Sequence, residues 1–269
     1  MIPVIIPFYQ RRDQLERCIQ HLQAQTQPVE IYVRDNNQEN LYFTRAINEG
    51  ILAYLDQDCD YMIALNQDMY LAPNAVEEMV RFMDTHPNCG IGMPLEILMR
   101  HPQGHALVGG ENAFPLGSHI SGPPEAYSHD EQLVWANACC WILRKAMIRE
   151  IGLLDKHLRL ISSDSDYCLR ARAENWTVWR IGAARGNHEQ GISTQRCALD
   201  LELIKADDTL YFAKKWLTGD LYRELASDGS KWSPQAVQHT VSQFTAGRHA
   251  IVEMIAKAKS KQTERLTEK

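Results

Sequence analysis

Short apolar runs alternate with amphipathic stretches through the N-terminal part of the chain, and this alternation limits the fold more than any other feature. We predict strands in the apolar runs and helices in the stretches between them. The expected strands are 3–7, 30–34, 61–65 and 90–94, and the expected helices are 13–22, 44–55 and 73–83. Strands that alternate with helices in this way predict a parallel sheet with right-handed crossovers.

Two helix starts can be predicted from local residues. Asp13 is followed by Glu16 three residues later, which resembles a capping box and predicts a helix that begins at Asp13. Pro73 suits the first turn of the third helix. The glycine patterns GxGxxG and GxxxxGK do not follow the first strand, which disfavours a Rossmann dehydrogenase and a P-loop enzyme.

The rest of the chain changes character several times. Residues 95–132 are rich in Gly, Pro and His, and predict extended loops or short strands that could form a mobile flap. We then expect an apolar segment, two helices and a strand, followed by a helical C-terminal region with one long last helix. The bounds are 133–143 for the apolar segment, 145–150 and 164–175 for the helices, 177–181 for the strand, 199–269 for the region and 234–261 for the last helix.

Composition narrows the class of protein. The net charge of −6 over 269 residues argues against a protein that mainly grips a nucleic-acid backbone, although charge alone does not exclude a nucleic acid as partner. Seven cysteines without a CxxC pair argue against a disulfide framework and a zinc site, and favour a reducing compartment. No signal peptide and no apolar stretch of about 18 residues is visible, so we expect a cytoplasmic protein, with peripheral contact to the inner membrane left open.

Polar residues follow the first three predicted strands at the point where each strand ends. The first cluster contains Pro7 and Tyr9, the second contains Asp35 and Asn36, and the third is the triplet 66–68. The carboxyl ends of parallel strands converge on one crevice, where ligands bind in open α/β sheets. An aromatic ring there could flank a nucleobase, and carboxylates could contact ribose or hold a hard cation. Each cluster taken alone is also compatible with ordinary turn chemistry.

Two further positions could carry chemistry. Asp164 is predicted near a helix N-terminus, where the helix dipole keeps a carboxylate ionised and able to accept a proton from a hydroxyl. The same run of Ser and Asp also suits plain helix capping, and Asp166 suits an internal hydrogen bond or salt bridge. His188 follows a predicted strand, and an imidazole with a carboxylate and diphosphate oxygens would satisfy Mn²⁺ or Mg²⁺.

These segments together resemble inverting family 2 glycosyltransferases of the GT-A fold, including rhamnosyltransferase-like proteins, over residues 3–216. Residues 4–11 resemble the family's nucleotide-lining "VVIPTYNR" start, and the segment from Asp35 resembles its "DNNS" region, where the aspartate contacts the base. Asn66-Gln67-Asp68 stands at the DxD metal motif, with Asn66 in place of the first Asp.

The second half of the resemblance concerns the acceptor side. Ser163-Asp164 stands at the family's "ED" pair, whose Asp is the catalytic base. His188, with Gly191 and Ser193, resembles the "H..G.S" motif, whose His can complete the metal site. The resemblance thus implies a base at Asp164 and metal ligands at Asp68 and His188. It further implies nucleotide contacts at Pro7, Tyr9, Asp35, Asn36, Asn66 and Gln67, and we expect acceptor contacts at Trp135 and Ser163.

The resemblance implies a GT-A domain over residues 1–198, with a nucleotide-binding half at 1–94 and an acceptor half at 95–198. We therefore expect transfer of a sugar from a nucleoside-diphosphate donor to a glycan, lipid-linked or other hydroxyl acceptor, with inversion, in surface polysaccharide or glycoconjugate synthesis. This requires Asp68 and Asp164 to meet across a shared cavity.

Other interpretations remain. Asn66 and Ser163 also suit a catalytically silent relative that binds sugar nucleotide or glycan. A nucleotidyltransferase is disfavoured, because residues 8–12 lack a Gly-rich loop. The last helix could pack on its own domain, form a homodimer or touch a membrane.

Overall fold

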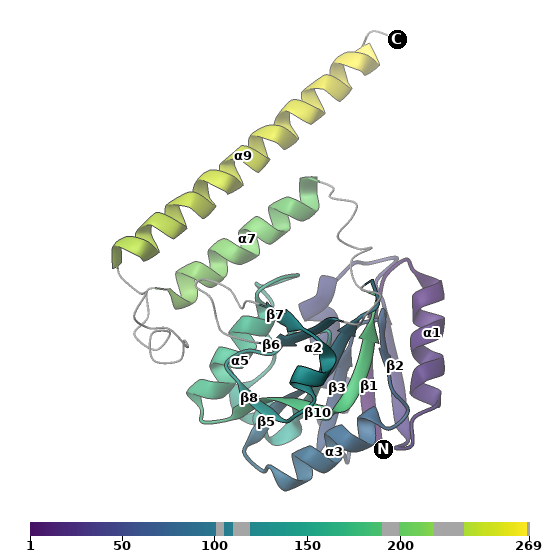
Figure 1. The fold of residues 1–269 in the computed structure, drawn as a ribbon. Coiled ribbons are helices and arrows are strands. Elements are labelled where there is room, and N and C mark those ends of the chain that lie inside the picture. The colour runs from purple at the N-terminus through teal and green to yellow at the C-terminus, as the bar shows by residue number, and fades with distance from the viewer. Residues whose placement is uncertain (101–104, 110–118, 190–198, 218–233, 268–269) are drawn as a thin grey trace.

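The computed structural model of the protein describes residues 1–100, 105–109, 119–189, 199–217 and 234–267, with side chains in 1–100, 120–189, 199–217 and 234–260. These residues form a mixed α/β unit around a ten-stranded sheet, followed by two C-terminal helices that lie beside it (Figure 1). The fold class is that expected from the sequence, an α/β fold with a mainly parallel central sheet and a helical C-terminal extension.

The N-terminal part confirms the predicted alternation. Its strands are β1 (Ile2–Phe8), β2 (Val29–Asp35) and β3 (Tyr61–Leu65), and its helices are α1 (Arg12–Gln23), α2 (Tyr42–Tyr54) and α3 (Ala75–Thr85). β1 pairs in parallel with both β2 and β3. Apolar residues of α1 and α3 pack on one face of the sheet, and those of α2 pack on the other, so each strand is covered on both sides.

The fourth predicted strand belongs to the same sheet but does not pair directly with the first three. The strands β5 (Cys89–Leu98), β9 (Cys140–Arg144), β10 (Thr177–His188) and β4 (Met69–Leu71) complete the order β2-β1-β3-β9-β5-β10-β4. β9 lies between β3 and β5 and is antiparallel to both, so β5 runs in the same direction as β3 without touching it along the sheet. β10 is parallel to β5, and only β9 and β4 run against the common direction of this path.

The segment after β5 contains short strands, as expected. β6 (His105–Gly109) and β7 (His119–Gly122) form an antiparallel pair that extends from β5. A 3₁₀ turn, η1 (Pro124–Tyr127), leads to β8 (Glu131–Leu133), which pairs with β10. Residues 101–104 and 110–118 lie outside the described residues, so the mobile flap stays a prediction.

Both predicted helix starts are wrong by one or more residues. α1 begins at Arg12, and the carboxylate of Asp13 forms an ion pair with Arg11 (2.6 Å) in place of a cap. α3 begins at Ala75, and Pro73 lies before its first turn, where its carbonyl accepts the backbone N–H of Thr26 (2.8 Å). At Asp13, a contact outside the helix takes the carboxylate on which the capping pattern depends.

The remaining helices lie close to their predicted bounds. They are α4 (Lys145–Ile151), α5 (Ser163–Ala173), α7 (Leu199–Trp216) and α9 (Pro234–Thr267). Phe212 and Trp216 of α7 share a core cluster with Leu158 and Leu169, while α9 packs along α7 through Val237 (Figure 1). None of the helices in the described ranges has the length and apolar composition needed to cross a bilayer. The six described cysteines are free and buried.

Candidate active site

The polar clusters after β1 and β3 are joined by one side chain, Gln67. Its amide oxygen accepts the backbone N–H of Tyr9 (2.7 Å), and its amide nitrogen donates to the carbonyls of Tyr9 (3.2 Å) and Arg11 (3.3 Å). The turn after β1 includes Gln10 in a left-handed conformation (φ 61°), which a non-glycine residue adopts only when its surroundings hold it. Gln67 therefore fixes the turn that presents the exposed ring of Tyr9.

The cluster after β2 joins the same group of turns. The backbone N–H of Asn36 donates to the carbonyl of Phe8 (2.8 Å), and that of Gln10 donates to the amide oxygen of Asn37 (2.8 Å). Asn37 also donates two hydrogen bonds to Asp35, which lower the pKa of this exposed carboxyl. All three strand-end clusters thus lie at one edge of the sheet.

Asp68 and His188 lie in contact although 120 residues separate them. The His188 ring nitrogen Nε2 is 3.2 Å from the Asp68 carboxylate oxygen Oδ1. The sheet produces this pair, because β4 starts immediately after Asp68 and its first residue, Met69, is the register partner of His188 at the end of β10. The backbone N–H of Glu189 also donates to the carbonyl of Asp68 (3.0 Å).

A buried carboxylate, Glu96, lies behind the His188 ring. Its Oε1 is 2.5 Å from Nδ1 of His188. Its Oε2 accepts a hydrogen bond from the Asn137 amide (2.9 Å) and another from the Cys139 thiol (3.2 Å). Burial lowers the pKa of His188, but the hydrogen bonds and charges of Asp68 and Glu96 outweigh burial and raise this pKa to about 9.

Asp164 lies in the first turn of α5, directly after Ser163. Burial raises the pKa of its carboxyl to about 6, against the opposing effect of hydrogen bonds from the backbone N–H of Ser165 and from the Trp135 indole. Ser162, which precedes the helix, has a left-handed backbone (φ 63°) and a buried hydroxyl without a hydrogen-bond partner among the described residues. An aspartate with this pKa is ionised at neutral pH and is more basic than a surface aspartate, which suits a general base.

One short segment connects the two acidic positions. Trp135 contacts Asp164 at its start, Asn137 holds Glu96 in its middle, and the carbonyl of Cys139 accepts the backbone N–H of Asn66 (2.8 Å) at its end. Four residue steps span at most roughly 14 Å of extended chain. The surroundings of Asp164 and those of Asp68 therefore border a single stretch of backbone.

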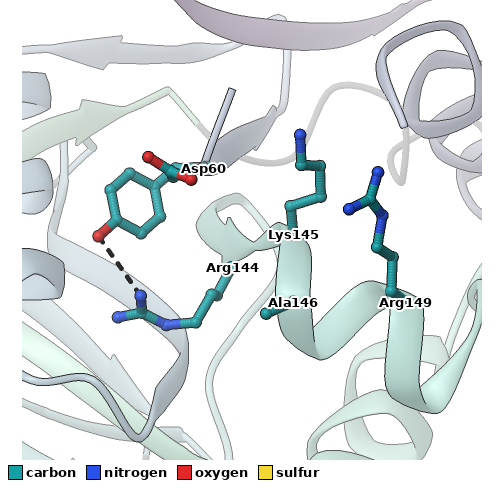
Figure 2. Close-up of a pocket in the computed structure, with 6 residues that line it drawn as sticks. Asp60, Arg144, Lys145, Ala146 and Arg149 are labelled. Carbon is teal, nitrogen blue, oxygen red and sulfur yellow. Dashed lines mark hydrogen bonds between the residues drawn. The ribbon is translucent and has the colours of Figure 1, made fainter. Parts of the chain in front are cut away.

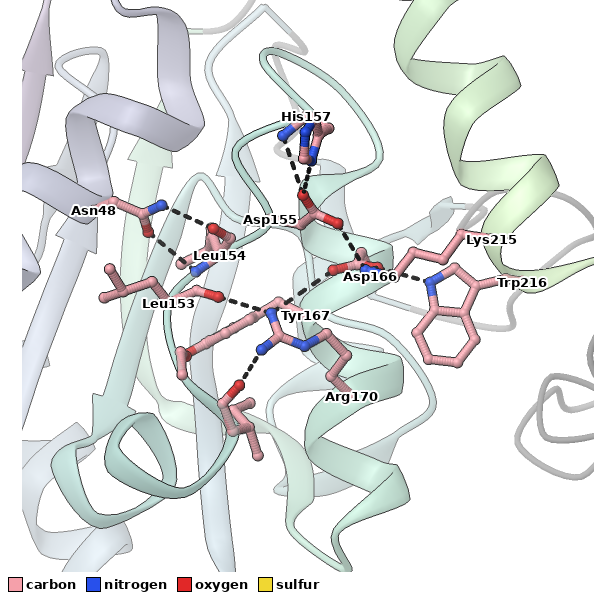
Figure 3. A network of polar contacts seen from close by, with 12 residues as sticks. Asn48, Leu153, Leu154, Asp155, His157, Asp166, Tyr167, Arg170, Lys215 and Trp216 are labelled. Carbon is pink, nitrogen blue, oxygen red and sulfur yellow. Dashed lines mark hydrogen bonds and ion pairs between the residues drawn. The ribbon is translucent and has the colours of Figure 1, made fainter.

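Helix α7 contacts Asp166 of α5, two residues after Asp164, and the loop that precedes α5 (Figure 3). The fully buried carboxylate of Asp166 accepts a hydrogen bond from the Trp216 indole (2.7 Å) and pairs with the Lys215 ammonium (2.6 Å). The same ammonium reaches Asp155 (2.8 Å), whose partners lower its pKa well below its usual value despite its burial. Asp208 accepts the backbone N–H groups at positions 160 and 161. The expectation that Asp166 makes an internal hydrogen bond or salt bridge is confirmed.

A pocket of about 340 Å³ lies elsewhere, at the amino end of β3 (Figure 2). It is lined by Tyr61 and by three basic side chains. Those cations donate to backbone carbonyls: Arg144 to the end of α3, and Lys145 and Arg149 to residues around the end of α2. Their role is to satisfy helix ends, and the pocket lies at the edge opposite to Asp68.

The other predicted site residues are placed as follows. Pro7 is half-buried at the end of β1, and the Asn36 amide is buried and bonded to the loop at residues 41–42. Trp135 and Ser163 are both about 3% exposed, so any acceptor would meet them only at their edges. Gly191 and Ser193 lie outside the described residues. The roles assigned to all these residues stay predictions.

Sequence reasoning missed Glu96 and Asn137. The signal for Glu96 was present, because it is a single carboxylate inside the apolar strand β5. Asn137 had no comparable signal, since its role depends on where β9 inserts into the sheet.

The donor set at Asp68 and His188 fits a hard or borderline divalent cation. A partly exposed carboxylate and an imidazole supply oxygen and nitrogen, which suit Mn²⁺ better than Mg²⁺. Two adjacent ligands of an octahedral ion bound at about 2.1 Å lie roughly 3.0 Å apart, close to the observed pair. In the described residues, Glu96, Cys139 and His188 also form a buried cluster of possible ligands.

No protein-family model matches the sequence, and no curated protein matches it. Solved structures do match. GalNAc-T7 with UDP, GalNAc and Mn²⁺ aligns with a TM-score of 0.62 at 11% identity over 97% of this chain and 57% of its own. TarS of S. aureus aligns with a TM-score of 0.53 at 11% identity over 83% of this chain. Its residues 1–349 with UDP align with a TM-score of 0.51 at 10% identity over 83% of this chain and 70% of their own.

The chain spans 57% of the GalNAc-T7 chain and 41% of the TarS chain. Identities at this level carry information on the fold alone. The chain therefore has the fold of the GT-A-type glycosyltransferases GalNAc-T7 and TarS.

Proposed function

We propose that this protein is a metal-assisted glycosyltransferase that moves a sugar from a nucleoside-diphosphate donor to an acceptor hydroxyl with inversion. The contact between Asp68 and His188 carries the proposal (3.2 Å). The resemblance to family 2 glycosyltransferases implies that these two residues, which lie far apart in the sequence, share one cation, and their contact supports this. The glycosyltransferase fold of the chain supports the same class of reaction.

The donor belongs at the carboxyl edge of the sheet. Tyr9 offers an exposed ring to a nucleobase, and Asp35 offers a carboxylate whose low pKa keeps it able to accept hydrogen bonds. UDP is the first nucleotide to test, because the GalNAc-T7 and TarS structures were determined with it. A divalent cation held by Asp68 and His188 would neutralise charge on the departing diphosphate.

Asp164 is assigned the role of general base. Its carboxylate would accept the proton of the acceptor hydroxyl as the oxygen attacks the anomeric carbon on the face opposite to the leaving group. The bond between that carbon and the diphosphate oxygen breaks as the new glycosidic bond forms, so the configuration inverts. A positioned base typically contributes a factor of about 10²–10⁴ in rate. Rhamnosyltransferase-like donors and acceptors in surface glycans are the specificities to test first.

The test is nucleoside-diphosphate release from UDP-, GDP- and dTDP-sugars with Mn²⁺, with and without candidate acceptors. We expect turnover with at least one donor, loss of it in Asp68→Asn and Asp164→Asn, and wild-type turnover in Asp56→Asn, an exposed carboxylate at the opposite edge. The anomeric coupling constant of the product, read by NMR, reports inversion. Donor binding without release across all donors would instead identify a catalytically silent binding protein, and near-normal turnover in Asp164→Asn would remove the base assignment.

A further inference from the structure

The carboxylate of Glu96 has no role in the proposed transfer, yet it lies where burial is energetically unfavourable for a charged group. It is completely buried in β5 between Leu95 and Ile97. A carboxylate removed from water in this way destabilises a fold unless it is paired and hydrogen-bonded. Its partners therefore indicate what it does.

We infer that Glu96 is a positioning residue that orients the His188 ring so that Nε2 faces Asp68 and a divalent cation can be shared by these two side chains. The inference rests on the proposed function. The first ground for it is the short contact between Glu96 Oε1 and His188 Nδ1 (2.5 Å), on the ring side opposite to Asp68. A histidine that binds a metal through one nitrogen keeps its proton on the other, and the acceptor of that proton sets the ring orientation.

The second ground is that Glu96 is itself held in place. Its Oε2 accepts hydrogen bonds from Asn137 (2.9 Å) and Cys139 (3.2 Å), so the carboxylate can neither rotate nor leave the ring. The register of β5 with β10 places Glu96 opposite Gly186, two residues before His188, on the same face of the sheet. The backbone and the side chains thus fix the same geometry.

Glu96, Cys139 and His188 could in principle bind an ion themselves, but the contacts favour the positioning role. Both Glu96 oxygens are already engaged, and Cys139 is 1% exposed. Burial and the nearby Glu96 carboxylate raise the pKa of this thiol well above its usual value, which disfavours the thiolate that a metal requires. Asp68, by contrast, has a side chain that is 16% exposed and can meet an arriving ion.

The experiment measures Mn²⁺ binding to the full-length protein by calorimetry, with and without UDP, for wild type, Glu96→Gln, Asn137→Ala, Cys139→Ala and Asp68→Asn. A glutamine at position 96 has one acceptor oxygen where glutamate has two, so it cannot accept both from His188 and from Asn137 and Cys139. Either the ring loses its acceptor, or the acceptor faces the ring without the two donors that hold it in place. We expect Glu96→Gln to weaken Mn²⁺ binding about 10–100-fold, as removal of such partners does elsewhere. Asn137→Ala and Cys139→Ala each remove one of the two hydrogen bonds that hold Glu96, so each should weaken Mn²⁺ binding less than Glu96→Gln does.

Turnover supplies a second measurement that a general loss of structure would not produce. In Glu96→Gln the Mn²⁺ concentration for half-maximal turnover should rise by the same factor, while kcat at saturating Mn²⁺ returns toward wild type. Asp164→Asn should show the opposite split, with low kcat at every Mn²⁺ concentration. Melting curves in EDTA establish that each variant is folded, and Asn137→Ala replaces Glu96→Gln as the test if the latter fails to fold.

The Mn²⁺ affinities of the variants distinguish the positioning role of Glu96 from the alternatives. Unchanged Mn²⁺ affinity in folded Glu96→Gln, with affinity lost in Asp68→Asn, overturns the positioning role and leaves the proposed function standing. Affinity lost in Cys139→Ala but kept in Asp68→Asn overturns it in favour of a buried Glu–Cys–His site. A wild-type protein that binds neither Mn²⁺ nor UDP overturns both this inference and the proposed function.

Discussion

The indole of Trp216 donates a hydrogen bond to the buried carboxylate of Asp166, with 2.7 Å between Nε1 and Oδ1. This contact joins the last residue of α7 to the first turn of α5, which also contains Asp164. The C-terminal helical region is therefore part of the support of the proposed base, and we expect its removal to affect catalysis as well as stability.

Trp216→Phe tests this support. Phenylalanine keeps most of the packing but removes one of the two partners of the Asp166 oxygen and leaves Lys215 as the other. A hydrogen bond to a charged group contributes about 1.5–3 kcal/mol. We expect urea denaturation to show a loss of that size, together with reduced turnover. In a double-mutant cycle with Asp166→Asn, additive losses would contradict a direct interaction between the two side chains.

Asp164→Asn should stabilise the protein while it removes turnover. The folded-state pKa of Asp164, about 6, lies above the ordinary value of 3.8, so ionisation opposes folding. This penalty is absent below about pH 4, grows as the pH rises toward 6 and is complete above it. Asparagine carries no such penalty, so the melting temperature of the variant should exceed that of wild type at pH 8 and match it near pH 4. Equal differences at both pH values would contradict the raised pKa.

The same pKa predicts the acid limb of the activity profile. If Asp164 acts as the base, its ionised form must be present, so kcat should fall by about tenfold for each pH unit below roughly 6. A profile flat down to pH 5 would separate catalysis from Asp164.

Ser162→Gly should raise stability. A left-handed backbone at a residue with a side chain is strained, and the Ser162 hydroxyl is buried without a partner in the described part of the chain. We expect a gain of about 0.5–1 kcal/mol by chemical denaturation. Asn175→Gly is the matched control, because Asn175 has the same backbone conformation (φ 65°) after the end of α5. Both variants should be stabilised; lower turnover in Ser162→Gly alone would show that the strained turn holds Asp164.

Gln67→Ala should weaken donor binding. The variant removes the hydrogen bonds that hold the turn at residues 9–11, and loss of about 1 kcal/mol of ordering raises a dissociation constant roughly fivefold to tenfold. The measurement is UDP binding in the presence of Mn²⁺. Gln20→Ala, an exposed change on α1, is the control and should leave binding unchanged. Equal affinities in both variants would show that the turn does not contact the nucleotide.

The sequence predicted the fold where local patterns decide it. Apolar runs that end in polar residues located β1, β2 and β3, and with them the shared edge on which Tyr9, Asp35 and Asp68 lie. The contact between Asp68 and His188 was foreseen only through a resemblance, because it depends on the pairing of β4 with β10.

Features set by long-range packing escaped prediction. β9 enters the sheet between β3 and β5, and the hydrophobic periodicity of the sequence does not predict this position. The insertion brings Asn137 to Glu96. The capping box at Asp13 failed because Arg11 competes for the carboxylate. Lys215 and Trp216 look like ordinary helix residues until α7 docks on Asp166.

The stretch from Trp135 to Cys139 borders both halves of the proposed machinery, and this limits how the protein can diverge. Ala136 and Ala138, which alternate with its contact residues, are buried in the core. A bulkier residue at either place would displace donor and acceptor chemistry in concert, so new substrate preferences should arise from surface loops long before they arise from this strip.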